Sequence, residues 1–206
     1  MSELEGNKIK EYWDKRSTEQ GERTVGFGNQ PISVQENNYR KRYEFIIPYL
    51  DREVMVLDYG CGIGRYTAFF KPEKYIGVDV CCNLLNIAEK NNPDYKFAYI
   101  PQGLLEFNKT IEPIQFIFTA TVLQHNSDRQ VLDIFKSWKP YLADSICFVF
   151  YENCHNANDT KHIAFRQPDK YMELISRVFS VADWTYDKHI IHGEEHAIMK
   201  FYCLNS

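Results

Sequence analysis

A series of alternating glycines directly after a short apolar segment is the feature of this sequence best suited to chemistry. Residues Val54–Leu57 are long enough for one buried strand, and Asp58 with Gly60, Gly62 and Gly64 then interrupts it. Glycine lets the chain turn tightly and lets a ligand approach the bare backbone. We expect a helix to start just behind the turn, where unpaired N–H groups and the helix dipole attract a polar or negative ligand. The segment therefore predicts a cofactor-binding turn.

A second candidate is the acid that ends the next apolar segment, Tyr75–Asp79. Asp79 lies 19 residues after Gly60, the distance at which a βαβ unit places an acid to hydrogen-bond ribose hydroxyls. An alternative role is the N-cap of a helix over residues 83–91. Asp79 supports a bound nucleoside without choosing the cofactor.

The spacing of the glycines separates two cofactor families. A dinucleotide fingerprint has the spacing G-x-G-x-x-G, but Arg65 stands where its third glycine would be. The pattern from Asp58 to Gly64 instead resembles the first motif of the class I S-adenosylmethionine-dependent methyltransferases. The segment Ile114–Thr119, followed by Val122-Leu123-Gln124-His125, resembles the fourth motif of this family in its small-molecule form. Two motifs roughly sixty residues apart are more specific than either alone.

This resemblance implies an α/β fold: a doubly wound, Rossmann-like, mainly parallel seven-stranded sheet with a C-terminal antiparallel hairpin and an N-terminal helical lid. It implies S-adenosyl-L-methionine as cofactor and S-adenosyl-L-homocysteine as product. Tyr12-Trp13-Asp14 is similar to a segment that closes over the cofactor in small methyltransferases, although its aromatic residues can equally serve only to pack the helix. Gln102 departs from the acid that commonly contacts adenine. The implied cofactor-binding residues are Tyr12, Arg16, Asp58, Gly60, Cys61, Gly62, Asp79, Val80, Gln102 and Thr119.

His125 is the catalytic candidate. In the enzymes that the sequence resembles, a histidine after the fourth strand lies near the transferred methyl group. An imidazole titrates near neutral pH, so His125 can take a proton from an acceptor hydroxyl or ammonium. The alternative is an architectural histidine that hydrogen-bonds the turn.

The candidates for acceptor binding lie in the polar connection 151–167. Ligands of open α/β sheets bind outside the carboxyl ends of the strands, so this segment is expected to overhang the acceptor. Tyr151, His155, His162 and Arg166 are the substrate-facing candidates. Arg166 can pair with a phosphate or carboxylate, or form a surface salt bridge.

Alternating strand and helix patterns predict the elements that position these residues. One domain is expected over residues 1–206, with a helical lid (1–50), a cofactor-binding core (51–151) and a substrate-side loop, helix and closing hairpin (152–206). The expected strands are 54–57, 75–79, 95–100, 114–119, 145–151, 184–191 and 195–203, with a turn at 143–144; the expected helices are 7–16, 33–50, 66–70, 83–91, 128–141 and 168–179, with a loop over 17–31.

Composition excludes several classes of protein. The net charge of -4 and the absence of a basic cluster larger than Arg40-Lys41-Arg42 argue against nucleic acid as a partner. The segment Thr119-Ala120-Thr121-Val122 also lacks the Asn/Asp-Pro-Pro-Tyr/Phe sequence of enzymes that methylate flipped bases. We expect neither a membrane span nor a signal peptide, because the longest apolar runs are strand-length and residues 1–8 lack the apolar core of a signal peptide. Six cysteines without a C-x-x-C pair indicate reduced thiols and a cytoplasmic location.

A metal site is not expected. His189, His192 and His196 stand near Glu194 and Glu195, but alternation along a strand separates His189 from His192 and no H-E-x-x-H pattern is present. A polar hairpin tip is the simpler interpretation.

The sequence predicts a methyltransferase that moves a methyl group to an oxygen or nitrogen of a small polar metabolite, as a monomer or homodimer. One alternative is a catalytically silent S-adenosylmethionine-binding subunit. Another is an NAD-dependent oxidoreductase, which Arg65 and the lack of a Tyr-x-x-x-Lys pair disfavour.

Overall fold

A seven-stranded sheet forms the centre of the computed structural model, which describes residues 3–20, 32–107, 112–154, 163–191 and 193–205. The strand order is β3-β2-β1-β4-β5-β7-β6. The first five of these pair in parallel, whereas β7 is antiparallel to both β5 and β6. The predicted parallel sheet with a closing antiparallel hairpin is therefore confirmed. The strands are β1 (Val56–Tyr59), β2 (Tyr75–Asp79), β3 (Lys96–Tyr99), β4 (Ile114–Ala120), β5 (Leu142–Asn153), β6 (Ser180–Ile191) and β7 (Glu194–Leu204).

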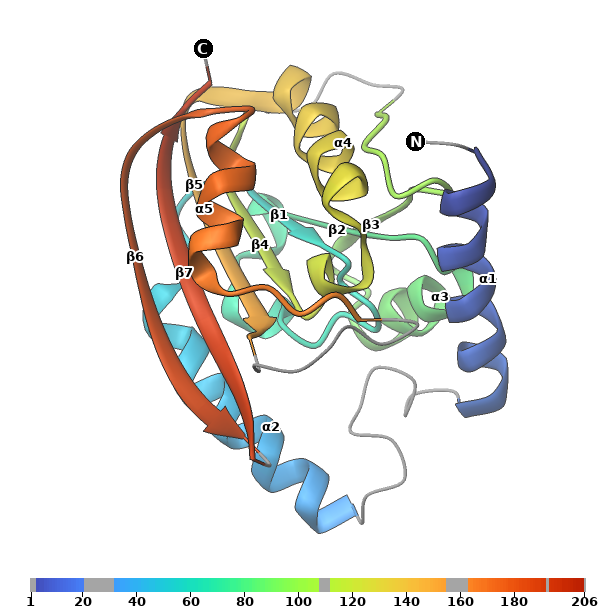
Figure 1. Ribbon diagram of the computed structural model, residues 1–206. Coiled ribbons are helices and arrows are strands. Elements are labelled where there is room, and N and C mark those ends of the chain that lie inside the picture. The colour runs from blue at the N-terminus through green and yellow to red at the C-terminus, as the bar shows by residue number, and fades with distance from the viewer. Residues whose placement is uncertain (1–2, 21–31, 108–111, 155–162, 192, 206) are drawn as a thin grey trace.

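Helices lie on both faces of the sheet and at its β3 end (Figure 1). In the described ranges no helix is both long and apolar enough to cross a membrane. Short 3-10 helices connect several elements, and the one that follows β4 is η5 (Leu123–His125). The α-helices are α1 (Glu3–Gln20), α2 (Ile32–Ile46), α3 (Cys82–Asn91), α4 (Asp128–Trp138) and α5 (Pro168–Ser176).

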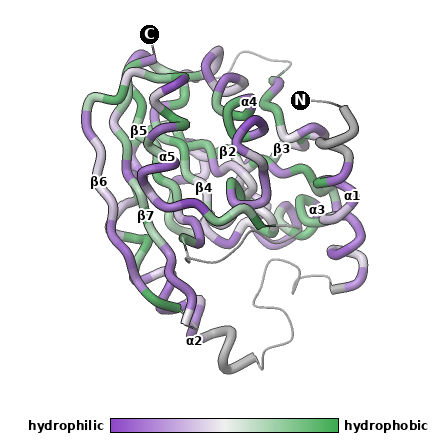
Figure 2. The backbone as a smooth tube through the Cα atoms, viewed as in Figure 1, coloured by the Kyte–Doolittle hydropathy of each residue, from purple (hydrophilic) through white to green (hydrophobic). Residues whose placement is uncertain are grey.

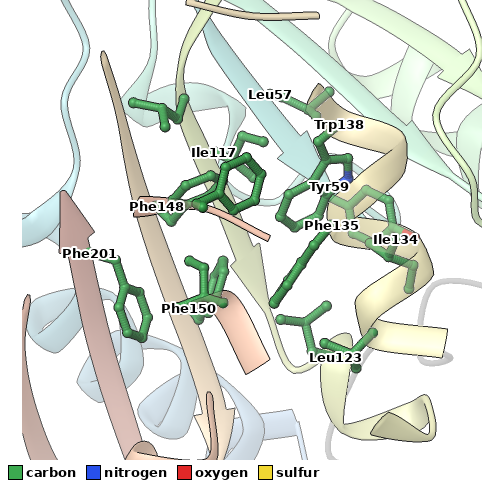
Figure 3. Packing of buried hydrophobic residues seen from close by; sticks show 14 of the residues in the cluster. Leu57, Tyr59, Ile117, Leu123, Ile134, Phe135, Trp138, Phe148, Phe150 and Phe201 are labelled. Atoms are coloured by element: carbon green, nitrogen blue, oxygen red, sulfur yellow. The ribbon is translucent and has the colours of Figure 1, made fainter. Parts of the chain in front are cut away.

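The larger core lies between the sheet and the helices α4 and α5. Figure 3 shows side chains of α4 facing side chains of β1, β4 and β5. The buried residues of α4 include Val131, Ile134, Phe135 and Trp138, which follow the i, i+3, i+4, i+7 spacing of an apolar helix face. A capping box between Ser127 and Gln130 begins this helix. Its position determines where the preceding turn, which carries His125, can lie.

A second core covers the opposite face, against α2 and the segment after the glycine turn. It includes Val56, Phe116 and Tyr151 from the strands, Ile46 from α2, and Tyr66. The central strands are thus buried on both sides, which explains why they read as continuous apolar segments. Figure 2 shows the contrast with β6, an edge strand that is mostly hydrophilic.

The structure corrects several expected elements. Strand β1 runs over Val56–Tyr59, so Asp58 lies inside it, and α1 continues to Gln20, where a loop was expected from residue 17. The chain after the glycine turn forms only a 3-10 helix, Thr67–Phe69, because three glycines with positive φ precede it and Pro72 follows closely. The dipole of a full helix behind the turn is therefore absent from this segment. The predicted turn at 143–144 lies inside β5, which begins at Leu142, paired with Ile114.

Candidate active site

A pocket of about 300 Å³ opens at the carboxyl ends of β1, β2 and β4. Its walls come from the glycine turn, the tip of β2, the segment after β3, the turn after β4 and helix α1. This edge of a doubly wound sheet is where ligands bind. The volume lies at the small end of the range for ligand pockets.

The glycine turn has a conformation that only glycine adopts readily. Gly60, Gly62 and Gly64 have φ values of +77°, +56° and +74°. A Cβ added at Gly60 would lie 2.4 Å from Cγ2 of Val122. Glycine is therefore required at position 60 by the turn and by close packing against the segment after β4. The lining of the pocket includes Gly60, Cys61 and Gly62.

Asp79 connects the tip of β2 to this turn. Its Oδ2 accepts a hydrogen bond from the Gly62 N–H at 2.9 Å, and its Oδ1 accepts one from the Cys81 N–H at 2.9 Å. Burial raises the pKa of the Asp79 carboxyl to about 6, although these amides oppose the shift. Asp79 lines the pocket, and a carboxylate has acceptor sites beyond two hydrogen bonds.

Asp58 also lines the pocket and is almost completely buried. Its Oδ2 accepts a hydrogen bond from the Tyr75 hydroxyl at 2.7 Å. Burial is the dominant effect on this carboxyl and raises its pKa to about 7; the Tyr75 hydroxyl lowers it, and the nearby charge of Asp79 raises it further. Asp58 therefore titrates near neutral pH.

The remaining residues that the sequence predicted for cofactor binding line the pocket only in part. Val80 and the exposed Gln102 line the pocket. Thr119 does not: its side chain is completely buried inside the sheet. The next three residues, 120–122, line the pocket instead. Side chains alternate between the two faces of a strand, so Ala120 faces differently from Thr119, and the chain leaves β4 after Ala120. Thr121 has a φ of 58°, a strained conformation for a β-branched residue.

Helix α1 covers the pocket with a different set of side chains from those predicted. Arg16 lines the pocket as expected, but Tyr12 does not; the Tyr12 hydroxyl accepts a hydrogen bond from Arg16 Nη1 at 2.8 Å. Trp13, which was not among the predicted site residues, lines the pocket and meets the His125 ring edge-on at 5.2 Å. Asn83 of α3 donates to the Ser17 hydroxyl at 3.2 Å and attaches α1 to the rest of the protein.

His125 lines the pocket at the end of η5. The buried carboxylate of Glu152 holds the start of this turn, since Oε1 accepts the N–H groups of Val122 (3.1 Å) and Leu123 (2.9 Å). Its Oε2 accepts the N–H of Gln124 at 3.2 Å. Burial raises the pKa of Glu152 to about 7 against the opposing effect of these amides. No pattern in the sequence distinguished Glu152 from other polar residues of the connection.

Two predicted substrate residues have other roles. Arg166 is buried, and its Nε donates to Asp128 at 2.8 Å while its remaining donors bond to backbone carbonyls, including those of Leu123 and Asn126. It does not line the pocket and instead fixes the segment 163–167 to the η5 turn. Tyr151 is fully buried behind the pocket, with its hydroxyl 3.0 Å from Nε2 of His189. His155 and His162 lie outside the described residues.

Several lining residues were missed because they come from elements that are distant in sequence. Asn153 and His196 face each other across the register of β5 and β7. His196 is buried and stacks on Tyr151 at 5.3 Å, so it is not part of a polar hairpin tip. Arg42 of α2 and Arg65 of the glycine turn also line the pocket. No local pattern in the sequence of α2 or of the hairpin strands indicates that these side chains reach the pocket.

Metal ligands do not gather in the part of the chain that the structure describes. Groups of three or more His, Cys, Asp or Glu side chains with suitable geometry are absent there. His192, one of the histidines considered, lies outside this part.

Sheet order and site together define a class of protein. An antiparallel β7 between β5 and β6, with a glycine turn after β1 and an acid at the tip of β2, is the class I methyltransferase arrangement. Residues 56–145 match the family described as "Methyltransferase domain". The match identifies a methyltransferase domain over these residues, as the resemblance of the motifs predicted. No curated protein sequence matches the chain.

Solved structures share this fold at low sequence identity. Magnesium protoporphyrin IX methyltransferase ChlM from Synechocystis PCC 6803, with bound S-adenosylhomocysteine, has a TM-score of 0.66 and 10% identity over 94% of this chain and 97% of that chain. Phosphoethanolamine N-methyltransferase 1 from Haemonchus contortus has a TM-score of 0.73 and 16% identity over 99% of this chain and 50% of that one. N-methyltransferase NodS from Bradyrhizobium japonicum WM9 has a TM-score of 0.65 and 15% identity over 96% and 98%.

The titration of Asp58 predicts how stability depends on pH. Its folded pKa of about 7 lies above the ordinary value of 3.8, so the folded protein keeps a proton that the unfolded chain has released. This contribution to stability is complete below about pH 4 and is lost as the pH rises to about 7, at up to about 1.4 kcal/mol per pH unit. Asp58→Asn should flatten this decline in urea unfolding between pH 5 and 8. The exposed Asp144→Asn serves as control; equal profiles for wild type and Asp58→Asn would contradict the assignment.

Glu152→Gln should destabilise the protein by about 1–3 kcal/mol. The glutamine amide presents N–H donors to backbone N–H groups and leaves at least one of them buried without a partner. Chemical unfolding measures the loss, and Glu44→Gln, an exposed change on α2, should have almost no effect. If both variants are equally stable, Glu152 does not hold the turn.

Proposed function

We propose that this protein transfers a methyl group from S-adenosylmethionine to an oxygen or nitrogen of a small polar metabolite bound in the pocket under α1. The observation that carries the proposal is the convergence of the glycine turn, Asp79 and His125 on one pocket of about 300 Å³. A pocket of this size, covered by a helix, suits a small acceptor better than a polymer. The proposal also treats residues 1–206 as one domain, with residues 1–50 as its lid, acting as a monomer or homodimer.

The residues of the cofactor half fit an adenosyl group with an amino-acid end. Gly60 to Gly62 offer bare backbone beside Asp58, and Asp79 can accept ribose hydroxyls with the acceptor sites that remain on its carboxylate. Cys61, Val80 and Gln102 complete this wall. When bound, S-adenosylmethionine supplies an electrophilic methyl group on a sulfonium, which is its own leaving group.

The chain itself has to align the acceptor, exclude water and receive a proton. Trp13 closes the pocket above His125 by an edge-on ring contact, which favours exclusion of water. We assign to His125 the role of base for an acceptor hydroxyl or ammonium, supported by its place in the lining and by the Glu152 carboxylate that holds its turn. The backbone N–H of His125 bonds to the Val122 carbonyl at 3.1 Å and closes the η5 turn.

The structures that resemble this one support a small acceptor. One of them is a phosphoethanolamine N-methyltransferase, in complex with phosphoethanolamine. Another acts on magnesium protoporphyrin IX. The acceptors named for these proteins differ widely while the sheet is shared, so the identity of the acceptor here depends on the residues that line the pocket outside the sheet.

Thermal unfolding with added ligands tests the cofactor. S-adenosylhomocysteine should raise the unfolding temperature saturably, and NAD should not. Gly60→Ala should weaken the binding of S-adenosylhomocysteine by at least about tenfold, because the new Cβ would lie 2.4 Å from Val122. Gly193→Ala is a matched control, with a similar φ of +76° but open space around it. Stabilisation by NAD alone would refute the proposal.

His125→Ala tests the base. Loss of a positioned base should lower turnover by about 10²–10⁴-fold, with the affinity for S-adenosylhomocysteine kept within about threefold in calorimetry. The remaining rate should rise with pH, as the acceptor loses its proton to solvent. A folded variant with full turnover on an acceptor found in a metabolite panel would leave His125 only an architectural role.

A further inference from the structure

One side of the pocket carries a concentration of positive charge that methyl transfer does not itself require. Arg42 of α2 and Arg65 of the glycine turn both line it. Both adjoin the same part of α2: Arg65 lies over the Tyr39 ring, this ring stacks on Tyr43 at 6.3 Å, and Arg42 directly precedes Tyr43. A third arginine, Arg16, approaches from the lid.

Each of the two guanidinium groups lies over an aromatic ring. The Cζ of Arg42 lies 5.2 Å from the centre of the Tyr151 ring, and the Cζ of Arg65 lies 4.2 Å from that of Tyr39. The side chain of Arg42 is buried, with 8% of its surface exposed. A guanidinium carries five N–H donors in a fork geometry that matches carboxylate and phosphate.

The tyrosines around Arg42 contribute no negative charge at neutral pH. Burial raises the pKa of the Tyr151 hydroxyl to about 12, and it raises that of Tyr66 as well. The acids of the cofactor half lie at the tips of other strands: Asp58 bonds to Tyr75, and Asp79 bonds to backbone amides. Asn153 of β5 with Glu194 and His196 of β7 also line the pocket; the Glu194 carboxylate accepts a hydrogen bond from the Asn153 amide at 2.8 Å and lies 3.8 Å from Nε2 of His196.

We propose that Arg42 and Arg65 bind an oxyanion, a carboxylate or phosphate, of the methyl acceptor. The substrate is then an anionic small molecule whose nucleophilic oxygen or nitrogen lies beside its charged group. This inference rests on the proposed function and specifies its substrate class. A carboxylate is also present on the cofactor, so the experiment separates the two sources.

Inorganic phosphate is the probe, added to the full chain saturated with S-adenosylhomocysteine at constant ionic strength with chloride. With the cofactor's own carboxylate already bound, phosphate should still raise the unfolding temperature saturably. Arg42→Met and Arg65→Met should each weaken the binding of phosphate by at least about tenfold. Arg40→Met, an exposed change on the same helix as Arg42, is the matched control and should bind phosphate as the wild type does.

Comparison of S-adenosylhomocysteine with 5′-methylthioadenosine, which lacks the amino-acid end, identifies the source of the anion. If both arginine variants weaken S-adenosylhomocysteine tenfold but leave methylthioadenosine unchanged, the arginines hold the cofactor carboxylate and the proposal fails. The absence of a saturable phosphate effect on the wild-type complex overturns it equally. Should Arg42→Met not fold, Arg65→Met and Arg65→Lys decide the outcome. Failure of the wild type to bind S-adenosylhomocysteine would instead count against the proposed function.

Discussion

Buried carboxylates that accept backbone N–H groups hold the carboxyl edge of the sheet in one arrangement. Asp79 joins the tip of β2 to the glycine turn, and Glu152 joins the end of β5 to the turn after β4. A buried N–H group without a partner costs about 1–3 kcal/mol, so both turns depend on these acceptors. The two turns are also packed together, with Val122 directly against Gly60. Because they form the pocket walls, the shape of the site follows from these bonds.

Charged side chains of both signs line the pocket. Asp58 and Asp79 lie at the tips of β1 and β2, Arg42 comes from α2, Arg65 from the segment after β1, and Glu194 from β7. Helix α1 covers the pocket and contacts the turn after β4 through Trp13 and His125. A nucleoside beside the two aspartates and an anionic acceptor beside the two arginines are complementary to this arrangement.

The segments that line the pocket lie partly inside and partly outside the family match. The family match covers residues 56–145, which include the glycine turn, Asp79 and His125. Arg42 and His196, which also line the pocket, come from outside this range. Proteins with 10–16% identity share the sheet, because a buried sheet needs only apolar side chains in the correct alternation. The acceptor residues proposed above come from both regions, with Arg65 and His125 inside this range and Arg42 in the flank before it.

The sequence by itself determined the sheet class, the glycine turn and Asp79, since apolar runs, glycine spacing and an acid at a strand end are local patterns with local physical causes. Tertiary structure decided which side chains reach the pocket. Thr119 and Ala120 differ by one strand position and therefore face different environments. Arg166 was open to a ligand or a surface ion pair, but burial among backbone carbonyls gave it a structural role. Arg42 and His196 reach the site only through helix packing and hairpin register, which depend on contacts between distant segments.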